Sequence, residues 1–221
     1  MIKSTGSRYR VLADDGIIHE CVLKGRFRVS GVRTTNPVAV GDRVTFDGRE
    51  NVITSLHPRR NYIIRRASNL SRESQVIAAN IDQAFLMISV TMPETPIEFI
   101  DRFLATAEAY RIPVSILINK RDLYDREDEA QAARIMSVYE KIGYTVYILS
   151  AAADSSISRI TDALKGKITL LSGNSGVGKS TLLNRLNPAL SLTTGEISEY
   201  HEQGRHVTTF RELRPVEDLR A

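Results

Sequence analysis

Short runs of alternating hydrophobic and polar residues fill the first sixty positions of the chain. Four such runs are RYRVLAD (8–14), IIHECVL (17–23), VAVGDRVTF (38–46) and NVITSL (51–56). Alternation of this kind predicts β-strands, and Gly16 between the first two runs favours a tight hairpin turn. Several strands in so short a stretch, without a helical period, predict a small closed barrel such as an OB-fold over residues 1–67.

After Ile81 the pattern changes to apolar strands that alternate with helical segments. AFLMISV (84–90) is continuously apolar, which is typical of a strand buried on both faces. Further strands are predicted at 114–118, 144–150 and 168–172, and helices from Ile97 onward and at about 126–142, 156–165 and 179–187. This alternation predicts an α/β fold with a mostly parallel sheet and helices on both faces. Thr95 to Glu98 have the spacing of a capping box at the start of the first helix.

Residues 65–80 show no amphipathic pattern and are interpreted as a linker, with a domain boundary near Ala67. The chain then divides into a barrel at 1–67 and an α/β domain at 68–221, the latter incomplete at its C-terminal end.

The charge of the chain is uneven. Residues 1–80 carry 14 Lys and Arg against 7 Asp and Glu, a net +7, and the remainder carries 16 against 19, a net −3. A basic first third indicates a surface for a polyanion such as RNA, although a solvated arginine-rich surface is the alternative. The single cysteine, Cys21, excludes an intrachain disulfide and a thiolate zinc site. With no signal peptide and no apolar run of membrane-spanning length, we expect a cytoplasmic protein without a membrane partner.

A phosphate-binding loop follows the strand at 168–172. The pattern G-x-x-x-x-G-K-[S/T] is complete, and a helical segment begins at its end. Backbone N–H groups of such a loop surround the β-phosphate, Lys179 contacts the β- and γ-phosphate oxygens, and the Ser180 hydroxyl ligates Mg²⁺. The predicted phosphate-binding residues are Gly173, Asn174, Ser175, Gly176, Val177, Gly178, Lys179, Ser180 and Thr181.

A second motif, Asn119-Lys120-Arg121-Asp122, follows the strand at 114–118, where ligands bind in open α/β sheets. The Asp122 carboxylate can accept hydrogen bonds from the ring N–H and exocyclic amine of guanine, which adenine does not offer at that edge. Asn119 would tie the loop to neighbouring backbone, and the Lys120 stem would lie along the base. Ser150-Ala151 is placed to give a backbone N–H to the guanine oxygen. A turn or helix-start cluster is the alternative for the N-K-x-D string.

The base motif precedes the phosphate loop, the reverse of the order in ordinary small GTPases. Circular permutation keeps such a site and moves the termini. This order, behind a basic barrel, resembles the ribosome-small-subunit-dependent GTPases of the RsgA/YjeQ family. The resemblance extends over essentially the whole chain and includes VGDRV (40–44), ANIDQ (79–83), IDRFL (100–104), NKRDL (119–123), GNSGVGKSTLLNRL (173–186) and GRHVTT (204–209).

The resemblance implies a GTP hydrolase that acts with Mg²⁺ on the 30S subunit late in its maturation, with the barrel contacting 16S rRNA. We expect the chain to be a monomer. The resemblance assigns His206 to positioning the attacking water, and Thr208 and Thr209 to the Mg²⁺ and γ-phosphate contacts. Without the resemblance, a Gly-Arg-His segment is interpreted as a solvated loop. The family's D-x-x-G motif and C-terminal zinc domain are absent from these 221 residues, so no zinc is expected here. We therefore expect a shortened chain that binds GDP or GTP and hydrolyses GTP poorly.

The basic loop and strands of the barrel supply the candidate RNA contacts. Phe27 within the basic loop either stacks on a base or belongs to the core. The candidates for phosphate contact are Lys24, Arg26, Arg28, Arg33 and Arg43. Two other functions stay open: a non-catalytic rRNA-binding module that guanine nucleotide stabilises, and an ATPase with a chance N-K-x-D string.

Overall fold

The structure is a computed structural model that describes residues 1–5, 7–24, 37–66, 74–153, 157–192 and 211–213. The chain forms two compact units. The first comprises Met1–Ile81 and Gly204–Pro215, and the second comprises Asp82–Gln203 and Val216–Ala221. Within the described ranges no helix is long and apolar enough to cross a membrane.

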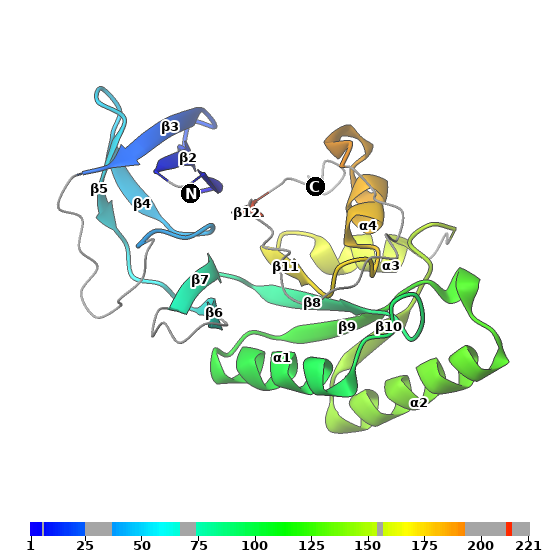
Figure 1. Ribbon diagram of the computed structural model, residues 1–221. Helices are drawn as coiled ribbons and strands as arrows, with labels where there is room; N and C mark the ends of the chain where they lie inside the picture. The colour runs from blue at the N-terminus through cyan, green and yellow to red at the C-terminus, as the bar shows by residue number, and fades with distance from the viewer. Residues whose placement is uncertain (6, 25–36, 67–73, 154–156, 193–210, 214–221) are drawn as a thin grey trace. The chain divides into compact units, whose positions relative to one another are not determined.

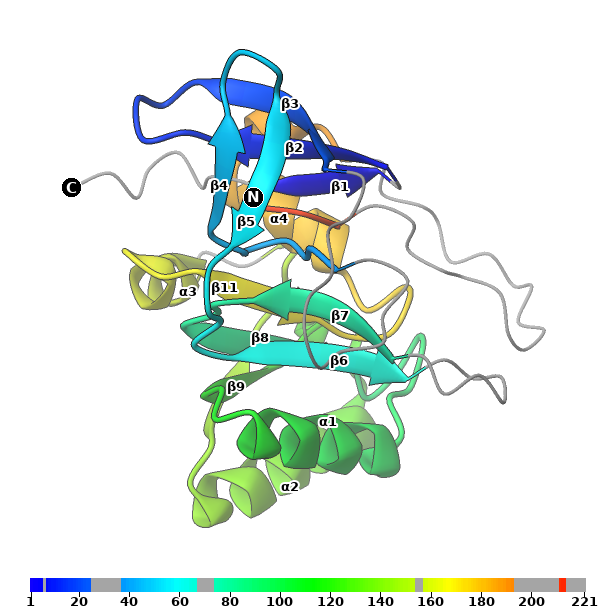
Figure 2. The ribbon, with the colours of Figure 1, turned by 90° about the vertical axis from the view of Figure 1, so that its left-hand side faces the viewer.

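The first unit is built on a six-stranded sheet with the order β12-β1-β2-β3-β5-β4 (Figure 1, Figure 2). Its strands are β1 Lys3–Thr5, β2 Arg8–Leu12, β3 Ile18–Leu23, β4 Val44–Asp47, β5 Val52–Leu56 and β12 Arg211–Glu212. Alternation along β2 buries Tyr9 and Val11 and exposes the residues between them, as the sequence pattern predicts. These side chains join Cys21, Val40 and Ile53 in one core. The predicted OB-like barrel is thereby confirmed.

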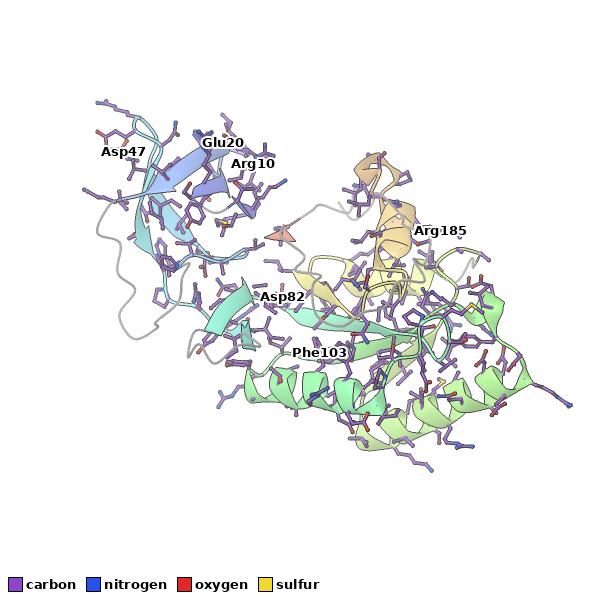
Figure 3. The ribbon with its side chains drawn as sticks, viewed as in Figure 1. Arg10, Glu20, Asp47, Asp82, Phe103 and Arg185 are labelled. Carbon is purple, nitrogen blue, oxygen red and sulfur yellow. The ribbon has the colours of Figure 1, made fainter. Side chains whose placement is uncertain are left out.

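The β2–β3 hairpin shows how the sequence sets the register of the barrel. Gly16 adopts a φ of +83° in the turn, and Asp15 Oδ1 accepts a hydrogen bond from Ile17 N at 2.9 Å. Arg10 and Glu20 are then directly opposite and form an exposed ion pair at 3.3 Å (Figure 3). An exposed pair of this kind contributes little stability. The turn and the buried alternation therefore determine the register.

The linker interpretation of residues 65–80 is wrong for the part that the structure describes. β6 (Tyr62–Arg66) pairs antiparallel with β7 (Ser74–Ala79) in a hairpin of the first unit. The hairpin lies close to the barrel at Gly41, where a Cβ would come within 2.0 Å of Ala79 O. β7 contains few large apolar residues, so its sequence carries only a weak strand signal. The strand forms because it pairs with β6 across the hairpin. The domain boundary predicted near Ala67 falls outside the described residues and stays a prediction.

The second unit contains a parallel sheet with the order β10-β9-β8-β11. The strands are β8 Gln83–Ile88, β9 Val114–Ile118, β10 Thr145–Ile148 and β11 Thr169–Ser172, and the helices are α1 Ile97–Ala109, α2 Arg126–Ile142, α3 Ile157–Leu164 and α4 Lys179–Leu186. Figures 1 and 2 show α1 and α2 on one face of this sheet and α3 and α4 on the other. The predicted α/β fold is therefore confirmed. Every residue of β8 is buried, as a central strand requires.

The start of α1 differs from the predicted capping box. Pro96 is the N-cap residue, and no side chain caps the helix. The Thr95 hydroxyl instead accepts a hydrogen bond from Ser89 N at 3.1 Å, and Thr95 N donates to Ser89 O at 2.8 Å. These two bonds close the loop between β8 and α1. The Thr95 side chain therefore stabilises this loop and does not cap the helix, although its spacing predicts a cap.

Candidate functional site

The phosphate loop joins β11 to α4 and depends on glycine at two positions. Gly173 has a φ of +148°, and a Cβ there would lie 2.2 Å from Met87 O of β8. Gly178 has a φ of +100°, and a Cβ there would lie 2.3 Å from Asn119 Nδ2. Both backbone conformations are strained for other residues. The glycines let the loop pass close to two neighbouring strand ends.

Lys179, the first residue of α4, folds back over the loop. Its Nζ donates hydrogen bonds to Gly173 O at 2.9 Å and to Asn174 O at 2.6 Å, and burial lowers the pKa of its ammonium. The ammonium therefore lies against the carbonyl groups of the loop that leads into α4. A multiply charged anion at this helix start would meet two sources of positive potential, the ammonium and the helix N-terminus.

Asn119 links the base motif to the phosphate loop. It follows β9 and is only 2% exposed. Its Nδ2 donates to Val177 O at 2.8 Å, and its Oδ1 accepts from Ala151 N at 2.8 Å. Tyr124 Oη donates to Asn119 O at 2.6 Å, which holds the backbone of the same residue. One buried amide thus joins segments that follow β9, β10 and β11.

Asp122 lies in a short 3₁₀ turn, Arg121–Leu123, and is exposed to solvent. The Ser150 hydroxyl donates a hydrogen bond to Asp122 Oδ1, and Ser150 is buried. The Ser150 Oγ also accepts from Ala153 N at 3.2 Å, so the serine holds its own loop and the carboxylate together. The carboxylate is left accessible in a fixed orientation.

Lys120 contacts a segment that the sequence did not mark. It adopts a φ of +70°, its Nζ donates to Met92 O, and burial lowers the pKa of its ammonium. Pro93, the next residue of that loop, lies beside Gly176, where an added Cβ would be 3.3 Å from Pro93 Cδ. Because β8 lies between β9 and β11, the loop after β8 touches both motifs. Its contacts come from strand order, and no local pattern indicates them.

The loop after β10 offers a second backbone donor besides the predicted one. The Ala151 N–H already donates to Asn119, whereas the Ala152 N–H has no partner among the described residues. The role predicted for Ala151 stays a prediction. Ala152 is the neighbouring candidate for contact with a ligand.

Several predicted residues fall outside the part of the chain that the structure describes. These are the barrel residues Arg26, Phe27, Arg28 and Arg33, and the residues His206, Thr208 and Thr209. Lys24 and Arg43 are described, and both are exposed. Within the described ranges no group of three or more His, Cys, Asp or Glu side chains could hold a metal ion.

The arrangement of a phosphate loop and a base motif in permuted order matches a known family. The family described as "RsgA GTPase" matches residues 56–219, and the one described as "RsgA N-terminal domain" matches residues 1–53. The chain belongs to the RsgA GTPase family. It is therefore a member of a family of GTP hydrolases, as its sequence motifs predict.

Relatives of the RsgA family support this assignment at high identity. The "Small ribosomal subunit biogenesis GTPase RsgA" of Bacteroides fragilis is 51% identical over 98% of this chain and 71% of its own length. The protein of the same name from Porphyromonas gingivalis is 50% identical over 99% of this chain and 71% of its own length.

Two solved structures show the same fold. YjeQ from Thermotoga maritima superimposes with a TM-score of 0.67 at 35% identity, covering 88% of this chain and 66% of its own. YloQ, described as a circularly permuted GTPase, superimposes with a TM-score of 0.61 at 32% identity, covering 85% of this chain and 63% of its own. The permuted order predicted from the motifs is thereby confirmed.

The RsgA-family site fits a nucleotide with Mg²⁺. The positive-φ glycines allow the loop to turn tightly into α4, and Lys179 supplies a cation there. The Ser180 hydroxyl, at the second position of α4, has no hydrogen-bond partner among the described residues. It could therefore hold Mg²⁺, which would neutralise negative charge on the phosphates of a bound nucleotide.

Proposed function

We propose that this chain binds GTP with Mg²⁺ and hydrolyses it to GDP and phosphate, acting with the 30S ribosomal subunit late in its maturation. The observation that carries the nucleotide part is the Asn119 side chain, which joins the base motif to the phosphate loop at 2.8 Å although Val177 lies 58 residues further along. The ribosomal part is drawn from the names of the relatives, which are small ribosomal subunit biogenesis GTPases.

Guanine recognition is assigned to Asp122. Its carboxylate accepts from the ring N–H and the exocyclic amine of guanine, while the Ser150 hydroxyl keeps the carboxylate in place. Adenine presents no matching pair of donors, and its binding would leave the carboxylate without partners. A site built on such bonds rejects the wrong base by up to about 10⁴-fold.

Phosphate binding is assigned to the loop from Gly173 to Thr181. Its N–H groups and Lys179 bind the β- and γ-phosphates, and Ser180 ligates Mg²⁺. His206 positions the attacking water, and Thr208 or Thr209 contacts Mg²⁺ and the γ-phosphate. Binding of the triphosphate orders such segments, and hydrolysis releases them.

The barrel is assigned to 16S rRNA. The first 80 residues carry a net charge of +7, and Lys24 and Arg43 project exposed charges from the described barrel. Arg26, Arg28 and Arg33 complete the proposed contact set. Such phosphate contacts make affinity fall steeply with salt. We also propose that the protein acts in the cytoplasm as a monomer, and that the boundary between the barrel and GTPase domains lies near Ala67 in the chain.

Single-turnover hydrolysis with and without 30S subunits tests the catalytic assignment. The 221 residues contain no D-x-x-G motif, which in GTPases supports Mg²⁺ and the γ-phosphate, so we expect slow hydrolysis by this chain and acceleration by the subunit. The alternative is a non-catalytic rRNA-binding module, which the missing motif favours. That alternative predicts tight GDP binding, salt-dependent subunit binding and no hydrolysis above the uncatalysed rate under either condition.

Replacement of Asp122 by asparagine tests the base assignment separately. An amide can donate to a carbonyl at position 2 of the base, so D122N is expected to lose affinity for GDP and gain affinity for xanthosine diphosphate. Equal competition by ATP and GTP in the unmodified protein would instead support an ATPase.

A further inference from the structure

One side chain outside the sequence motifs joins the helix of the phosphate loop to the loop that follows β10. Arg185 lies in the last turn of α4 (Figure 3). Its Nη1 donates hydrogen bonds to Ala152 O at 2.6 Å and to Ala151 O at 3.4 Å. The guanidinium is permanently charged, so the bond at 2.6 Å is stronger than a bond between neutral groups, and the bond at 3.4 Å is the weaker of the two. Arg185 thereby holds two successive carbonyl groups from one side.

The contact with Ala151 O, the longer of the two at 3.4 Å, favours one orientation of the next N–H. The peptide between Ala151 and Ala152 is trans, so its C=O and N–H point in opposite directions. A donor held on the oxygen from α4 directs the Ala152 N–H away from that helix. The cation also polarises the peptide, which makes this N–H a better donor. The N–H that Arg185 orients is the one that has no partner among the described residues.

Arg185 also closes a ring of hydrogen bonds around the base motif. Val177 O accepts from Asn119 Nδ2, and Asn119 Oδ1 accepts from Ala151 N. Arg185 then returns from the Ala151–Ala152 carbonyls to α4, which begins two residues after Val177. The loop after β10 is therefore attached to the phosphate-loop unit at two points, through Asn119 and through Arg185. A shift of α4 would move the donor of this loop with it.

We propose that Arg185 is a positioning residue for guanine recognition, which orients the Ala152 N–H toward the 6-oxygen of the base. The inference rests on the proposed guanine-nucleotide site and adds a residue that does not itself touch the nucleotide. Adenine carries an amine at position 6, which cannot accept this bond. Arg185 thus acts on discrimination at position 6, while Asp122 acts at positions 1 and 2.

Competition against fluorescent GDP with four ligands tests the proposal in the 221-residue chain. GDP and IDP both carry the 6-oxygen, whereas ADP and pyrophosphate do not. R185A is expected to lower the affinities for GDP and IDP by the same factor, about fivefold. This factor corresponds to the loss of one charge-assisted hydrogen bond that acts through a neighbouring peptide. ADP and pyrophosphate should bind as before. R185K should recover part of the loss, because an ammonium can still donate to one carbonyl. The control R134A removes an exposed arginine of α2 and should change the affinity for none of the four ligands.

The outcomes separate the inference from the function on which it rests. A loss that is equal for GDP, ADP and pyrophosphate would show that Arg185 only supports the phosphate loop, and the inference would be wrong. An unchanged ratio of GDP to ADP affinity in R185A would also overturn it. If the unmodified chain showed no preference for GDP over ADP, the proposed guanine site itself would fall. A smaller ratio of GDP to ADP affinity in R185A, with pyrophosphate affinity unchanged, supports the proposal.

Discussion

Replacement of Asn119 by alanine tests whether one buried amide holds the site together. The side chain is 2% exposed and makes two hydrogen bonds of 2.8 Å, to Val177 O and from Ala151 N. Val177 and Ala151 are themselves buried, so the alanine variant leaves a carbonyl and an N–H without partners. Each such group costs about 1–3 kcal/mol, and the expected loss in the free energy of unfolding is about 3 kcal/mol.

Urea unfolding followed by circular dichroism at 222 nm measures this loss. The described α-helices all lie in the second unit, so the helical signal reports on the unit that contains Asn119. N119A should lower the urea midpoint with little change in slope. N119D should be at least as destabilised, because a carboxylate oxygen would face Val177 O. R134A, on an exposed position of α2, serves as the control and should stay within about 0.5 kcal/mol.

The same variants should lose GDP affinity, because the loops that follow β9 and β10 are no longer held against the phosphate loop. A stability change below about 0.5 kcal/mol for N119A would refute the reasoning, since two buried partners cannot lose their bonds at so low a cost. Retained GDP affinity in a clearly destabilised N119A would limit the role of this amide to folding.

Three further variants test other parts of the structure. G178A places a Cβ 2.3 Å from Asn119 Nδ2 at a φ of +100°, and should reduce GDP affinity at least about tenfold in the same competition assay. Burial raises the pKa of Tyr124 from 10.0 to about 12, so the folded state keeps a proton that the unfolded state loses. Stability should therefore fall as pH rises from 10 to 12, and Y124F should unfold with a shallower pH dependence over that range. Asp42 is buried and forms an ion pair at 2.7 Å with the largely buried guanidinium of Arg59. D42N leaves this guanidinium without a counter-charge and should lower the stability of the barrel by about 3–5 kcal/mol, measured by hydrogen exchange of the barrel amides.

The sequence alone determined the chemistry and the type of most elements. Glycines and Lys179 at fixed spacing after an apolar strand specify a phosphate loop, because only that backbone can turn several N–H groups inward. Asn119 and Asp122 at the end of another apolar strand indicate the base site for a similar local reason. The barrel hairpin at Gly16 and the buried strand β8 also follow from patterns within a few residues.

Only the tertiary structure decided which segments meet. β7 is a strand because β6 lies beside it, and its own residues carry a weak signal. Thr95 bonds with Ser89 instead of capping α1, and Met92 reaches Lys120, because β8 runs between the strands that carry the two motifs. Arg185 belongs to no motif, and its contact with Ala152 joins positions 33 residues apart. Local patterns specify residues that are near in sequence, whereas these contacts depend on strand order, which arises when the whole sheet forms.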